Sequence, residues 1–126
     1  MKGLVLPAQM VLRVCGVLAL ALGLFFWAGD LLQLIAVHML LGLLVVLALW
    51  LLSGAAAAAG LLPLGVTGLV LGLVLAWLGF TQDSLLPGAG HAVVQIVHFL
   101  LGVAAVAFGE IVGGRLRRAM VAQSGA

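Results

Sequence analysis

Two histidines stand in matched six-residue strings, Val37–Gly42 and Val97–Gly102, which differ only in having Met39 or Phe99 at the third position. Each string lies inside a long apolar run, where an ionisable side chain is costly and therefore points to a function. Imidazole is also the commonest side-chain ligand of metals. His38 and His98 are thus predicted to be a pair of ligands that approach one central object.

The composition places these histidines in a membrane. Of the 126 residues, 67% are hydrophobic and 6% are charged, against about 25% charged in a soluble domain. A membrane-spanning helix needs about 20 apolar residues. The sequence offers four such stretches, at about 8–28, 31–52, 62–80 and 91–113. We predict an all-α integral membrane four-helix bundle, a single membrane domain over residues 1–126 that contacts the lipid bilayer.

The chain also has the pattern of a tandem duplicated helical hairpin. The two histidine strings are offset by 60 residues (98 minus 38). A shift of 56 residues aligns three upstream features, Leu6-Pro7 with Leu62-Pro63, Gly16 with Gly72, and Leu22-Gly23 with Leu78-Gly79. We predict repeat 1 at about 6–52 and repeat 2 at about 62–113, with the difference in offset absorbed by a longer connection at 81–90. Pro7 and Pro63 are expected at the openings of the first and third spans, where a missing backbone donor costs little.

Parallel repeats of this kind are related by an axis along the membrane normal. His38 and His98 are then expected to face each other from the second and fourth spans, both about 10 Å below one surface. Two imidazoles on opposite faces of a flat macrocycle are the arrangement that holds a haem iron, and bundle cores supply it well. Gly42 and Gly102 lie four residues after the histidines, on the same helix face. We expect these glycines to leave room for the macrocycle.

With these strings and this architecture, the chain resembles the membrane-bound b-type cytochromes, four-helix haem bundles that include the membrane anchors of quinone-linked dehydrogenases. The resemblance implies one haem b, with His38 and His98 as the axial ligands of its iron. Members of this class usually hold a second histidine pair deeper in the same helices. This sequence has none there, so a two-haem path across the bilayer is not expected.

His91 and Gln95 share a helix face with His98, at i, i+4 and i+7. They are predicted to bond a haem propionate or the carbonyl of a quinone, which is the second candidate ligand. The alternative is that His91 is an interfacial histidine satisfied by water.

Charge placement predicts the topology. The connections at 29–30 and 81–90 hold Asp30 and Asp83 but no Lys or Arg, whereas a group of arginines follows the fourth span. By the positive-inside rule, both termini are cytoplasmic, and we expect a prokaryotic cytoplasmic membrane. The net charge of +2 is too small to indicate a nucleic-acid partner.

Arg13 and Glu110 are the two charges drawn into the first and fourth spans. A mutual salt bridge would relieve the desolvation of both, provided that these spans are adjacent. The alternative is that Glu110 relays protons to a quinone site.

Low-spin iron with two histidine ligands has no open position, so electron transfer is the expected function. The chain would be an electron-transfer protein or an oxidoreductase subunit rather than a stand-alone enzyme, with partner subunits or as a homodimer. Two other classes stay open. One is a small four-span transporter with a proton or metal-ion path through His38, His98 and Glu110. The other is a structural or assembly subunit whose histidines only pack.

Overall fold

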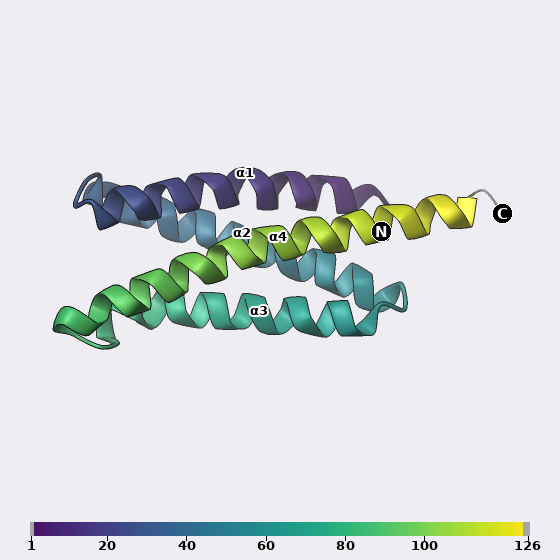
Figure 1. Cartoon of the computed structure of the whole chain (residues 1–126). Helices are drawn as coiled ribbons and strands as arrows, with labels where there is room; N and C mark the ends of the chain where they lie inside the picture. The colour runs from purple at the N-terminus through teal and green to yellow at the C-terminus, as the bar shows by residue number, and fades with distance from the viewer. Residues whose placement is uncertain (1, 125–126) are drawn as a thin grey trace.

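The computed structural model describes residues 2–124, which form four long helices (Figure 1). These are α1 (Lys2–Trp27), α2 (Ile35–Ala58), α3 (Leu62–Thr81) and α4 (His91–Ser124). Three single-turn 3-10 helices complete the connections, η1 (Leu32–Leu34), η2 (Gln82–Ser84) and η3 (Gly88–Gly90). Each of the four long helices is apolar and long enough to cross a membrane. The predicted all-α, four-helix integral membrane fold is therefore confirmed.

Two helices extend further along the chain than the sequence predicted. The segment at 53–60, expected as a loop, is helical as far as Ala58, and the chain turns at Gly60 with a φ of 82°. Alanine is the best helix former, so its run extends α2 rather than ending it. α4 continues past residue 113 to Ser124, because Arg, Leu, Ala and Met all favour helix.

The prolines differ from each other. Pro63 stands in the first turn of α3, as expected. The expectation for Pro7 was wrong, because α1 begins at Lys2 and Pro7 lies inside it. Five helical residues precede Pro7, so α1 starts more than one turn before the predicted opening.

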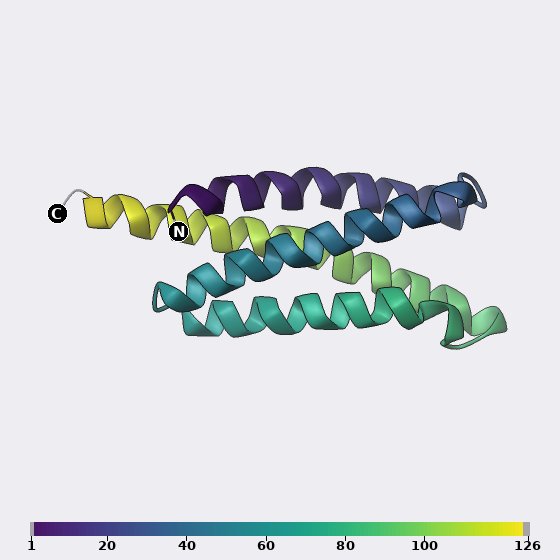
Figure 2. The same cartoon turned by 180° about the vertical axis from the view of Figure 1, so that it is seen from behind.

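The helices pack as two antiparallel hairpins, α1–α2 and α3–α4 (Figures 1 and 2). α1 and α3 each pack on both α2 and α4, and these two also contact each other across the bundle. Since every connection reverses the chain, α2 and α4 run in the same direction. They are the helices that carry His38 and His98.

Buried side chains fill the middle of the bundle and the end at which the two termini lie. The middle cluster includes Leu12, Val45, Leu49 and Ala105, all 3% exposed or less. The cluster nearer the termini comprises Val5, Ala8, Leu52, Ala56, Val112 and Leu116. At the opposite end the hairpins diverge (Figure 2), and a cavity takes the place of a packed core.

α2 and α3 approach closely because small residues line their contact. Gly68 of α3 lies against the Ser53 side chain, and Gly72 lies against the ring of Trp50. Trp50 donates a hydrogen bond to the Leu69 carbonyl at 3.1 Å. Close backbone approach through glycine is a common way for membrane helices to associate.

Candidate functional site

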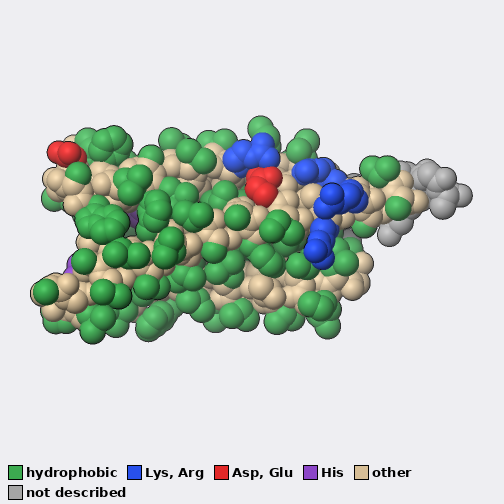
Figure 3. Space-filling model, viewed as in Figure 1, with side chains coloured by type: hydrophobic (Ala, Val, Ile, Leu, Met, Phe, Trp, Pro, Cys, Tyr) green, Lys and Arg blue, Asp and Glu red, His purple; other side chains and the backbone are tan. Residues whose placement is uncertain are grey.

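The cavity has a volume of about 390 Å³ and lies between the two hairpins, at the end opposite the termini. The space-filling view shows a notch at this end with histidine atoms inside it (Figure 3). All the residues singled out from the sequence as candidate ligands or contacts line this one cavity, namely His38, Gly42, His91, Gln95, His98 and Gly102.

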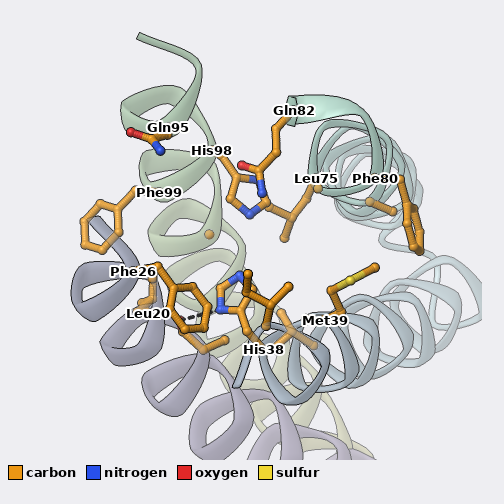
Figure 4. A pocket seen from close by; sticks show the side chains of 18 of the residues that line it. Leu20, Phe26, His38, Met39, Leu75, Phe80, Gln82, Gln95, His98 and Phe99 are labelled. Carbon is orange, nitrogen blue, oxygen red and sulfur yellow. Dashed lines mark hydrogen bonds between the residues drawn. The ribbon is translucent and has the colours of Figure 1, made fainter. Parts of the chain in front are cut away.

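The imidazoles of His38 and His98 face each other across the cavity (Figure 4). Their ring centres are 6.3 Å apart and their planes are inclined by 59°. A metal–imidazole bond is about 2.0–2.1 Å long and a ring centre lies about 1.1 Å from its nitrogen, so a shared metal separates two opposed ring centres by about 6.3 Å. The observed spacing agrees with this value. Whether the pair binds a metal stays a prediction.

His38 is oriented by α1. Its Nδ1 donates to the backbone carbonyl of Ala19 at 3.0 Å, since a carbonyl can only accept. The rings of Phe26 and His38 pack edge to face, with centres 5.3 Å apart and planes inclined by 70°. With the hydrogen on Nδ1, the second nitrogen, Nε2, presents a lone pair. This is the tautomer that ligates metals.

His98 is placed differently. Its Nδ1 is buried and has no hydrogen-bond partner among residues 2–124. A Cβ added to Gly79 would lie 3.3 Å from Cε1 of His98. A Cβ added to Gly23 would lie 3.7 Å from Cε1 of His38. Each histidine therefore rests on a glycine of the preceding helix in its own hairpin. The sequence aligned these two glycines but did not identify them as part of the site.

The two glycines predicted to make room differ in their surroundings. A Cβ at Gly42 would meet nothing within 4 Å, whereas one at Gly102 would lie 3.2 Å from the Leu20 side chain. Gly42 thus borders open space, and Gly102 borders the α1 wall.

Polar residues gather where the cavity opens between the helix connections. His91 and Gln95 of α4 are joined there by Gln82 and Asp83 of η2. The Nδ1 of His91 lies 3.3 Å from the carbonyl of Leu85, which ties the start of α4 to the preceding loop. Gln82 and Asp83 had not been predicted, because only the fold of the 81–90 connection brings them to the cavity.

The donor set does not suit a bare metal ion. Among the described residues, no group of three or more His, Cys, Asp and Glu side chains could hold one. Two histidines leave a zinc ion two ligands short of its usual four. A metal ion held by these two histidines would therefore need further ligands from another source.

A second polar cluster lies in the other half of the bundle, between α1 and α4. Nε and Nη2 of Arg13 donate to the two carboxylate oxygens of Glu110, at 3.0 and 2.8 Å. The predicted salt bridge is confirmed. Gln9, 1% exposed, also donates to Glu110 at 3.2 Å. Gln9 had not been singled out, because nothing in a helical pattern tells that a lone glutamine faces a neighbouring helix.

These features define a class, an integral membrane four-helix bundle with two opposed imidazoles in a cavity near one end. Comparisons of the chain with protein-family models, with curated proteins and with solved structures found no match. The function is therefore inferred from the cavity itself.

Proposed function

We propose that the chain holds one haem b between His38 and His98 and transfers electrons. The observation that carries this proposal is the pair of imidazoles, with ring centres 6.3 Å apart in a cavity of about 390 Å³. Cofactor pockets commonly measure about 300–1,000 Å³. A porphyrin brings four nitrogen ligands, so two histidines complete its iron.

The cavity walls suit a flat, apolar group. The α1 wall is formed in part by Gly16, Ala19 and Gly23, and the α3 wall by Ala76 and Gly79. Among them, Gly23 and Gly79 let the histidine rings approach the neighbouring helices closely. Aromatic and apolar side chains complete the lining, including Phe26, Phe80 and Phe99 (Figure 4).

The polar mouth supports the same proposal. Haem b has an apolar ring and two carboxylates, so its pocket needs polar groups at one edge. Gln82 and Gln95 provide amide hydrogen-bond donors there, while Nδ1 of His91 is engaged by the Leu85 carbonyl. Asp83 also lines this edge, and its negative charge would repel the carboxylates of haem, so the neutral donors are the expected contacts.

The chemistry follows from the ligand set. A bound haem supplies a one-electron redox centre, and two histidine ligands leave it no open position for oxygen chemistry. The chain's own residues hold and orient the group, while the bundle core separates it from the terminal end. The electron partner would be a quinone in the bilayer or a protein that docks at the cavity end.

Charge supports an orientation. The arginine side chains gather toward the end with the termini, away from the cavity (Figure 3). By the positive-inside rule this end is cytoplasmic, in our proposal the cytoplasmic side of a prokaryotic membrane. The site then lies near the outer surface, and one haem there does not bridge the bilayer.

The rival functions predict other arrangements. A proton or ion pathway would need Glu110 to be available, but Arg13 occupies both of its carboxylate oxygens. A purely structural role would have the histidines bonded to neighbouring helices. His38 has such a bond, but both imidazoles also line a cavity.

Single-histidine variants test the proposal. His38→Ala and His98→Ala should each abolish the low-spin, six-coordinate absorption spectrum of the haem-loaded protein. His91→Ala should keep it, because His91 bonds the Leu85 carbonyl and does not face the opposite imidazole. A low-spin spectrum that survives loss of His38 or His98, but not of His91, would refute the ligand assignment.

A further inference from the structure

The two imidazoles are supported unequally. His38 donates from Nδ1 to the Ala19 carbonyl and packs edge to face with the ring of Phe26. Both contacts come from α1, the helix beside it in its own hairpin (Figure 4). The ring of His38 is therefore fixed in direction and in tautomer.

His98 lacks the corresponding hydrogen bond. Its Nδ1 is buried without a partner among residues 2–124. The 56-residue shift that aligns the hairpins puts Leu75 where Ala19 stands (19 plus 56). Leu75 is 7% exposed and its branched side chain lies beside the histidines (Figure 4). A side chain of that size keeps an imidazole from approaching the carbonyl behind it as closely as it can at alanine.

This difference matters for a metal ligand. A ligating histidine normally donates its other ring nitrogen to a carbonyl or carboxylate, which raises its basicity and fixes its orientation. Loss of that partner typically weakens metal binding by about 10- to 100-fold. His38 has such a hydrogen-bond partner and His98 does not, so the two histidines would be unequal ligands of a shared metal.

We propose that His98 is the exchangeable ligand and that the cavity binds a small uncharged diatomic molecule, such as carbon monoxide or nitric oxide, at reduced iron. This inference rests on the proposed haem. In the exchange, the bond between iron and Nε2 of His98 breaks and a bond to the incoming atom forms. The oxidation state of the iron is unchanged, and Nε2 of His98 keeps its lone pair. His38 remains bound throughout.

Carbon monoxide is the probe. The haem-loaded wild-type protein, His38→Gly and His98→Gly are purified, checked for helicity and monodispersity, reduced with dithionite and titrated with carbon monoxide. The wild-type complex should have the same iron–carbon and carbon–oxygen stretching frequencies as the His98→Gly complex, because His38, with its hydrogen bond to Ala19, is the remaining ligand in both. The His38→Gly complex should differ, because Nδ1 of His98 has no such partner among residues 2–124. Haem affinity should fall about 10- to 100-fold further in His38→Gly than in His98→Gly.

A reduced wild-type protein whose bis-histidine absorption spectrum does not change at saturating carbon monoxide would overturn the inference. So would a wild-type complex whose stretching frequencies differ from those of His98→Gly. This comparison decides even where His38→Gly fails to fold. Failure of the proposed function is a separate result, since a wild-type chain that takes up no haem would show it before any carbon monoxide is added.

Discussion

Arg13 and Glu110 form a two-point ion pair that joins α1 to α4, with both carboxylate oxygens accepting from one guanidinium. The two residues are 97 positions apart in the chain, so the pair links the first hairpin to the second. It lies between the middle of the bundle and the end that carries the termini, since Arg13 follows Leu12 of the middle cluster and Glu110 precedes Val112 of the cluster nearer the termini. The pair and the histidine cavity thus occupy opposite halves of the molecule.

Breaking this pair should loosen the bundle without touching the cavity. Glu110→Gln leaves the Arg13 guanidinium without its counter-charge inside a span, where an unpaired charge is unfavourable. We expect a lower thermal midpoint in detergent, and a double variant Arg13→Gln/Glu110→Gln that is less destabilised than the sum of the single variants. Additive effects would show that the pair contributes nothing.

The tautomer of His38 is a second prediction. Because the Ala19 carbonyl only accepts, the apo protein should hold neutral His38 with its hydrogen on Nδ1. Nitrogen NMR of protein labelled at histidine distinguishes the two ring nitrogens, and the His38→Ala variant assigns the signal. A hydrogen found on Nε2 would contradict the orientation described here.

Filling the cavity from α2 should prevent cofactor binding. Gly42 and Gly54 lie on the same helix, and neither has an atom within 4 Å of the position of an added Cβ. Gly42 lines the cavity, whereas Gly54 is exposed on the outside of the bundle. Gly42→Leu should lower haem affinity by about 5- to 150-fold, since overpacking costs about 1–3 kcal/mol and about 1.4 kcal/mol is tenfold.

Gly54→Leu is the matched control for this change. Its side chain points toward lipid and should leave haem affinity as in the wild-type protein. Equal losses in the two variants would mean that the effect comes from α2 as a whole and not from the cavity.

The α2–α3 contact predicts a stability effect. A Cβ at Gly68 would overlap the buried Ser53 side chain, so Gly68→Ala should destabilise the fold by about 1–3 kcal/mol. Gly54→Ala, in open space, should be neutral or slightly stabilising because alanine favours helix. Unfolding in mixed detergent measures both. A Gly68→Ala protein as stable as Gly54→Ala would show that α2 and α3 are farther apart.

Much of the fold could be predicted because the bilayer imposes it. Four apolar runs of sufficient length must be four helices in a bilayer. Arg13 and Glu110, the two charges inside spans, were expected to pair because pairing reduces the cost of burying each charge. The ends of the helices were harder, since the alanine run at 55–59 and the segment after residue 113 are equally compatible with helix or connection. Neighbouring packing and propensity, rather than hydropathy, extend them.

Only the part of the site that unusual residue types identify could be predicted from the sequence. His38 and His98 stood out because histidine is rare in apolar runs and the string repeats. The partner of His38 is a backbone carbonyl of Ala19, which no residue type reveals. Gln82 reaches the cavity only through the fold of its connection. The unequal support of the two imidazoles could therefore be seen only in three dimensions.

The absorption spectrum of the purified wild-type chain, before and after reduction, tests the central claim most directly. The proposal predicts one haem per chain, a sharp Soret band that shifts on reduction, and the spectrum of low-spin iron with two histidine ligands. A folded protein that is colourless as purified, and remains colourless after haem is added, would contradict it.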